Sequence, residues 1–159
     1  ASGNTSIGTS TTGRKLTVSG DSTFIHNPIT LLAASGVGGY GDIVTFGTGT
    51  TVAGYLYYLT STGGWSQTDA DSSTSSTGLL GIALGTSAAS SGVLIKGYAK
   101  YASFSAATVG AILYISTTPG LITSTAPSAT TDIVRIIGYQ IDATNDVIYF
   151  NPSNDWIEL

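Results

Sequence analysis

The stretch LYYLTSTG at residues 56–63 returns as LYISTTPG at residues 113–120, 57 positions further along the chain. Other positions repeat at the same spacing without a gap, among them Gly81 with Gly138 and Leu84 with Ile141. A fixed period of this length indicates a duplicated structural unit. Because glycines repeat together with apolar residues, the turns belong to the unit as well as the core. We expect two copies, over about residues 41–96 and 97–159.

Short apolar segments separated by Gly and Ser/Thr clusters run from residue 29 to the end of the chain. This pattern is typical of an all-β sandwich or barrel. The sequence therefore predicts an all-β fold, an internally duplicated antiparallel β-barrel or sandwich over residues 29–159. Strands are expected at residues 31–34, 43–46, 54–59, 78–84, 93–101, 111–116, 133–140 and 147–151.

Two segments depart from this pattern. Residues 1–28 are small, polar and only intermittently apolar, and an isolated hairpin of this kind is marginal in water. We therefore expect an extended, stalk-like N-terminal arm that pairs with other chains. Residues 66–77 are rich in Ser, Thr and Asp, and this low-complexity composition predicts an exposed loop.

Charge is sparse in this chain. Charged residues make up 9% of the 159 residues, against about 25% in ordinary soluble domains. Much of the surface is therefore expected to be covered by something other than water, and another copy of the same chain is the simplest candidate. The sequence predicts one β-domain that forms a homo-oligomer.

Composition also argues against several classes of partner. The formal net charge is -4 and the five basic residues are spread along the chain, so nucleic-acid binding is not expected. No continuous apolar run reaches the 18 or so residues of a spanning helix, so membrane insertion is not expected either. The absence of cysteine excludes disulfides and thiolate metal sites. We expect no cofactor.

Candidates for catalysis are weak. The single histidine, His26, has no G-x-S-x-G turn to complement it, so a structural or surface role is expected. Asp69 with Asp71, or Asp142 with Asp146, could form a glycosidase pair, and Asp69 with Asp71 could bind calcium. Aspartates beside Gly, Ser and Asn more often form turns. We expect no enzyme and no metal site, and keep Asp69 and Asp71 as possible loop contacts.

The segment 93–101 offers a better binding candidate. Strand alternation places Leu94, Lys96, Tyr98 and Lys100 on one face, so a tyrosine lies between two lysines. An aromatic face flanked by polar donors suits sugars and acidic glycans, whereas the alternative is a solvated sheet face. Lys96, Tyr98 and Lys100 are the predicted ligand-binding residues.

The segments NTSIGT at residues 4–9 and RKLTVSGD at residues 14–21 resemble repeats of bacteriophage and large-virus fibre proteins. That resemblance covers about the first 26 residues. The remainder, with VGAILYIS at residues 109–116 and PGLIT at residues 119–123, looks like glycine-punctuated β-domains of phage virion proteins, including capsid-decorating ones. The resemblance implies a virion component, usually trimeric, without enzymatic residues.

These observations lead to a functional expectation. The chain is expected to be the distal part of a virion fibre at the particle surface, a homotrimer whose head displays a site for a host glycan and gains avidity from three weak sites. The alternative is a capsid decoration or cement protein, with the arm lying across neighbouring capsid subunits. A third class, a polysaccharide-degrading enzyme, would depend on Asp69 or Asp71.

Overall fold

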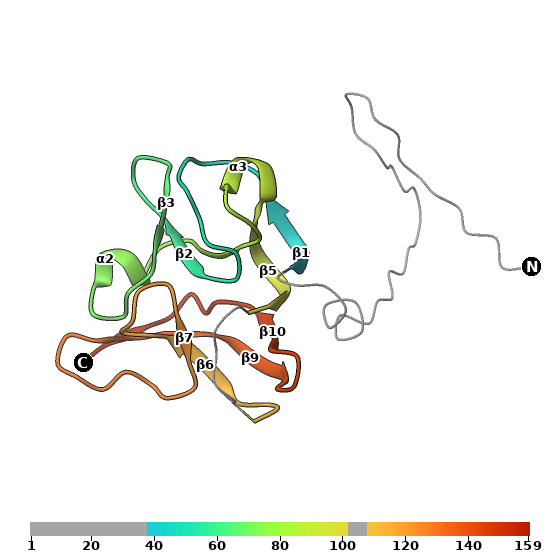
Figure 1. Cartoon of the computed structure of the whole chain (residues 1–159). Coiled ribbons are helices and arrows are strands. Elements are labelled where there is room, and N and C mark those ends of the chain that lie inside the picture. The colour runs from blue at the N-terminus through green and yellow to red at the C-terminus, as the bar shows by residue number, and fades with distance from the viewer. Residues whose placement is uncertain (1–37, 102–107) are drawn as a thin grey trace, which may run out of the picture.

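The computed structural model describes residues 38–101 and 108–159, which form an antiparallel sheet curled into a half-barrel (Figure 1). Within these residues there are eleven strands and two helices of four residues each. The predicted all-β class is therefore confirmed. The predicted arm over residues 1–28, the predicted strand at residues 31–34 and His26 all lie outside the described residues.

The strands follow one another along the chain with the two helices between them. Their bounds are β1 (Gly39–Val44), β2 (Leu56–Leu59), β3 (Trp65–Gln67), α2 (Ser73–Ser76), β4 (Leu80–Ala83), α3 (Ala88–Ser91), β5 (Val93–Lys100), β6 (Ile112–Ile115), β7 (Ile122–Thr123), β8 (Ile133–Val134), β9 (Ile136–Asp142), β10 (Val147–Phe150) and β11 (Ile157–Glu158). The main sheet has the order β3-β2-β4-β5-β10-β9-β6-β7, β1 also pairs with β5, and β11 pairs with β8 in a small second sheet.

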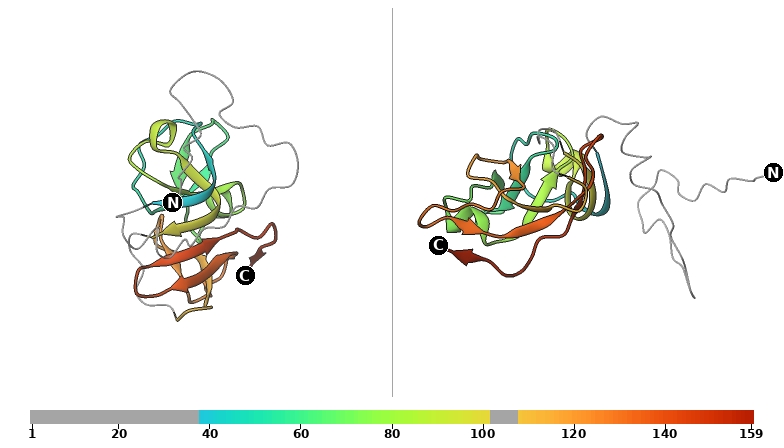
Figure 2. Two further views of the ribbon diagram at one scale, coloured as in Figure 1. Left: turned by 90° about the vertical axis from the view of Figure 1, so that its right-hand side faces the viewer. Right: turned by 90° about the horizontal axis from the view of Figure 1, so that it is seen from below.

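The strand order reads the same from both ends of the main sheet. Strands β3-β2-β4-β5 form one half, and their repeat counterparts β7-β6-β9-β10 form the other. The two halves lie side by side (Figure 2) and meet where β5 pairs with β10. This pairing is antiparallel and places Tyr98 opposite Tyr149. This is the arrangement expected from a duplicated sequence whose two copies join edge to edge.

One hydrophobic core is shared by both halves. It fills the inner face of the curled sheet and includes Leu56, Ile82, Leu94, Leu113, Ile137, Ile148 and Phe150, none of them more than 1% exposed. A second, smaller cluster lies on the outer face of the first half and contains Tyr57, Trp65, Ala83, Ala88 and Val93. Trp65 donates its indole N–H to the carbonyl oxygen of Phe46 at 2.9 Å, so the β1–β2 connection covers this cluster.

The expected exposed loop at residues 66–77 is wrong. The segment contains part of β3 and the whole of α2, and Thr68, Ala70 and Ser76 have no exposed surface. The Ala70 N–H donates to the carbonyl of Ser116 at 3.0 Å, and the Ala70 carbonyl accepts from the Ile133 N–H at 2.8 Å. These hydrogen bonds connect the first half of the chain to the second, so the segment is part of the contact between the two halves.

A β-bulge in β5 changes which side chains face the core. Asp42 lies opposite Lys96 and Ile43 lies opposite Leu94, which leaves Ile95 as the extra residue. Leu94 therefore points into the shared core on one side of the bulge and Ala99 does so on the other. The expectation that Leu94 shares a face with Lys96 is wrong for this reason.

Strands β9 and β10 approach each other closely at Gly138, and a substitution at this position tests that approach. Its φ is +153°, and a Cβ at this position would lie 2.0 Å from the carbonyl oxygen of Tyr149. Gly138→Ala is expected to lower the free energy of unfolding by about 2–3 kcal/mol. In contrast, a Cβ at Gly78 would meet nothing within 4 Å, so Gly78→Ala should change the free energy of unfolding by less than about 0.5 kcal/mol. Chemical denaturation of both variants measures the difference, and equal stability would contradict so close an approach of the two strands.

Tyr101 makes stability depend on alkaline pH. Its hydroxyl oxygen accepts the N–H of Ile122 at 2.8 Å, and burial raises the pKa of Tyr101 well above its ordinary value of 10.0. The Tyr101 hydroxyl therefore ionises at a lower pH in the unfolded chain than in the folded one. Because of this difference, the free energy of unfolding should fall as the pH rises past about 10. Tyr101→Phe should lower the free energy of unfolding by about 1–2 kcal/mol at pH 8, because the Ile122 N–H loses its acceptor. Above pH 10 the free energy of unfolding of this variant should fall less steeply than that of the wild type. Urea denaturation at a series of pH values tests both effects, and parallel curves for the two proteins would contradict the assignment.

Candidate binding surface

Four tyrosines lie directly opposite one another across four neighbouring strands. Tyr40 of β1 pairs with Tyr98 of β5, Tyr98 pairs with Tyr149 of β10, and Tyr149 pairs with Tyr139 of β9. Side chains of directly opposed residues project from the same face of a sheet. These four residues therefore form a continuous band on the outer face, which we call the tyrosine row.

The tyrosine row is partly exposed to solvent, and its strands are held in place by neighbouring residues that pack into the core. Tyr40 is 39% exposed and Tyr139 is 44% exposed, while Tyr98 and Tyr149 are half-buried. The rings of Tyr98 and Tyr149 lie with their centroids 5.2 Å apart and tilted by 47°, a favourable aromatic geometry. The strand neighbours of this pair, Ala99 and Ile148, point into the core and fix the orientation of the strands.

The outward position of Tyr139 depends on a second bulge. Its repeat counterpart is Ile82, which is completely buried. In the second half, Leu113 pairs with Gly138 and Tyr114 pairs with Ile136, so one extra residue of β9 lies between them. The extra residue inverts the alternation, and Tyr139 faces outward where Ile82 faces inward.

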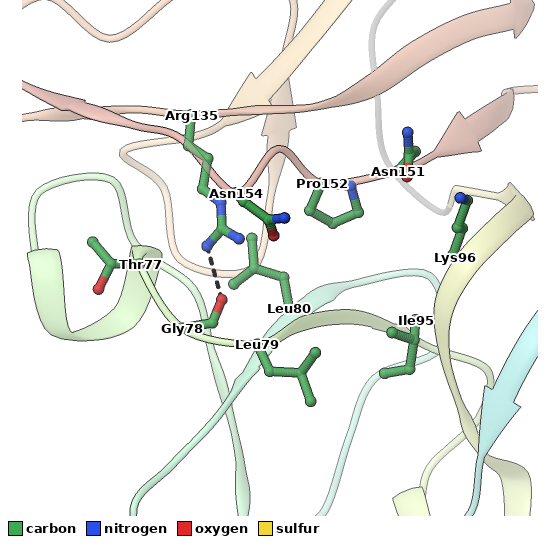
Figure 3. Close-up of a pocket in the computed structure, with 10 residues that line it drawn as sticks. All are labelled: Thr77, Gly78, Leu79, Leu80, Ile95, Lys96, Arg135, Asn151, Pro152 and Asn154. Carbon is green, nitrogen blue, oxygen red and sulfur yellow. Dashed lines mark hydrogen bonds between the residues drawn. The ribbon is translucent and has the colours of Figure 1, made fainter.

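A cavity opens beside the tyrosine row where the two halves of the sheet join. Strand β4 pairs with β5 only at Val93 and Leu94, and β10 pairs with β5 from Gly97 onward. Between these pairings the sheet separates and leaves a cavity of about 420 Å³, the junction cavity (Figure 3). Pro152, which has no N–H to donate, follows β10 at this point. The cavity is lined by Leu80, Ile95, Lys96, Arg135, Asn151 and Asn154, among others.

Arg135 forms hydrogen bonds to two of the segments that line the junction cavity. It is 5% exposed, and its Nη1 donates to the carbonyl oxygens of Ser76 and Gly78 at 2.6 and 2.8 Å. Its Nε donates to the carbonyl oxygen of Ser153 at 2.8 Å. Burial lowers the pKa of the Arg135 guanidinium, but arginine remains charged in proteins. One cation thus connects the α2–β4 segment to the C-terminal segment.

The structure brings the three predicted ligand-binding residues to one face. Lys96, Tyr98 and Lys100 alternate along β5 after the bulge; Lys96 is exposed and Lys100 is half-buried. Their role in binding stays a prediction. No sequence pattern predicts Tyr40, Tyr139, Tyr149 or Arg135 as site residues. The only available signal for the tyrosines was their abundance, nine against four phenylalanines.

Asp69 and Asp71 lie in a turn away from these residues. The Asp69 carboxylate accepts the N–H of Asp71 at 3.1 Å, and the Asp69 carbonyl accepts the hydroxyls of Ser75 and Ser76 at 2.9 and 2.6 Å. Desolvation, followed by the charges of Asp69 and Asp132, raises the pKa of the Asp71 carboxyl. These contacts are those of a turn former.

The described residues contain no group of three or more His, Cys, Asp or Glu side chains placed to hold a metal ion. No helix in the described part of the chain is long and apolar enough to cross a membrane. Comparison with protein-family models gave no match, and neither the curated proteins nor the solved structures gave a significant match. The tyrosine row and the junction cavity are therefore the features that bear on function.

Replacing Arg135 tests its role as a connection between the halves. Arg135→Lys keeps the charge but cannot make all three hydrogen bonds, so the free energy of unfolding should fall by about 2 kcal/mol. The matched change Lys96→Gln, at an exposed side chain, should stay within about 0.5 kcal/mol of the wild type. Thermal and chemical denaturation measure both, and an unchanged Arg135→Lys variant would show that the connection is not needed.

Proposed function

We propose that this chain is a carbohydrate-binding domain at the surface of a virus particle and that sugar rings stack on the tyrosine row. The observation that carries the proposal is the direct opposition of Tyr40, Tyr98, Tyr149 and Tyr139 across four strands. Tyrosine combines apolar ring area with a hydroxyl that tolerates water, which suits a ligand with apolar C–H faces and polar edges.

The surroundings of the tyrosine row favour a polar ligand over an apolar one. Lys96 and Lys100 lie on the same strand as Tyr98, two positions before and after it. Such donors can bind the hydroxyl or acid groups of a saccharide, whereas a permanent protein interface is usually depleted in lysine. The row is also long enough, at four strands spaced about 4.8 Å apart, to contact more than one sugar ring.

Placement at the virion surface follows from the fibre resemblance of the N-terminal segments, and it completes the proposal. A single open platform of this kind binds weakly. Three such platforms on a trimeric head would engage a repetitive glycan together, and the second and third contacts would form at a high effective concentration. The proposed protein is thus the distal part of a trimeric fibre that binds a host glycan.

The test begins with the mass of the full chain in solution, followed by a glycan array probed with that assembly. Binding to a saccharide is expected, and Tyr139→Ser or Tyr149→Ser should weaken it about tenfold, because each removes part of the stacking surface. The matched control is Phe46→Ser, at an aromatic side chain that is 45% exposed but lies near Trp65. A stable monomer would contradict the trimer. Absence of glycan binding by a correctly assembled trimer, or equal losses in all three variants, would contradict the binding role.

A further inference from the structure

We infer that the junction cavity binds the carboxylate of an acidic saccharide whose neighbouring ring stacks on Tyr98 and Tyr149. The inference rests on the proposed function, because the tyrosine row supplies the rest of the contact. It adds the chemical class of the sugar, a uronic-acid type. The volume of about 420 Å³ lies within the range of small-molecule sites, about 300–1,000 Å³.

The charge distribution supports an anionic ligand. The chain carries nine acidic and five basic residues, yet the two charged residues that line the junction cavity, Lys96 and Arg135, are both basic. The remaining basic residue of the described part, Lys100, lies on the same face of β5. Asp42 lies opposite Lys96, but on β1, which occupies the other edge of β5 from the cavity. A carboxylate in the cavity would therefore meet two cations and no lining carboxylate.

Arg135 retains donors for such a group. Nε and Nη1 donate to three carbonyl oxygens, whereas Nη2 makes no hydrogen bond to a described residue and is not among the fully buried atoms that lack a partner. The guanidinium is held by neutral carbonyl oxygens, and its Cζ lies 6.0 Å from the centroid of the Trp156 ring, so its described contacts include no carboxylate. Figure 3 shows the guanidinium beside Asn154 and opposite Leu80, within the lining of the cavity. The amides of Asn151 and Asn154 add further hydrogen-bond donors.

The cavity and the tyrosine row are continuous along two strands. Lys96 lies two residues before Tyr98 on β5, and Asn151 lies two residues after Tyr149 at the end of β10. Two residues of a strand span about 6.6 Å, close to the length of one sugar unit. A ring stacked on Tyr98 and Tyr149 would therefore place a neighbouring carboxylate at Lys96 and the entrance to the cavity.

The experiment compares two oligosaccharides by isothermal titration calorimetry on the assembled full chain. One is an oligogalacturonate, and the other is the same oligosaccharide with its carboxylates reduced to alcohols. Wild type should bind the acidic form at least about fivefold more tightly, with an affinity that falls as salt is raised. Lys96→Gln should remove most of this preference, and Lys96→Arg, which keeps the charge, should restore it. Lys15→Gln, the same charge change in the N-terminal segment, is the matched control and should retain the preference.

The outcomes separate the two proposals. Equal binding of both oligosaccharides, with no effect of Lys96→Gln, would overturn the inference and leave carbohydrate binding intact. Failure of both oligosaccharides to bind, together with binding of free galacturonate that Lys96→Gln abolishes, would support an anion site and contradict stacking on the tyrosine row. A sulfated oligosaccharide serves as a third arm. Tighter binding of sulfate than of carboxylate at the same residues would overturn the assignment to a uronic acid.

Discussion

The pairing of β5 along both of its edges is the constraint on which the rest of this structure depends. Strand β1 occupies one edge over most of its length, while β4 and β10 share the other. Two half-sheets that would each leave an unpaired edge are thereby joined into one, and the shared core between Leu56 and Phe150 is closed. The junction cavity is the geometric result, since two strands that diverge cannot both follow one edge without leaving a gap.

Duplication produced a symmetrical scaffold with unequal outer faces. In the first half, α3 and the β1–β2 connection cover the outer face and form a second core around Trp65 and Val93. In the second half the corresponding face carries Tyr139, which is 44% exposed, and Tyr149, which is half-buried. The first half thus uses its outer face for packing around Trp65, whereas the tyrosine row crosses the junction, with Tyr40 and Tyr98 from the first half and Tyr139 and Tyr149 from the second.

Much of the fold follows from the sequence, but the composition of the surface does not. Alternating apolar residues and repeated glycines predict the all-β class, and strand alternation places Lys96, Tyr98 and Lys100 together. The bulges at Ile95 and in β9 each add one residue without a local signal, and they reverse the faces of Leu94 and Tyr139. The polar composition of residues 66–77 predicts an exposed loop. That prediction is wrong because several of the hydroxyl groups are hydrogen-bonded inside the fold, and the sequence does not reveal their partners. Ser76, for instance, is buried with its hydroxyl bonded to the Asp69 carbonyl at 2.6 Å.

The tyrosine row also has a consequence for the order of folding. Its members come from strands as distant in sequence as β1 and β10, and they align only after three separate strand pairings have reached their final register. Two of these pairings, β1 with β5 and β5 with β10, are non-local and form slowly, because long loops must close before the contacts compensate for the lost entropy. A partly folded chain would therefore have an incomplete row. The ring-to-ring coupling of Tyr98 with Tyr149, seen by near-ultraviolet circular dichroism, therefore reports on the pairing of β5 with β10.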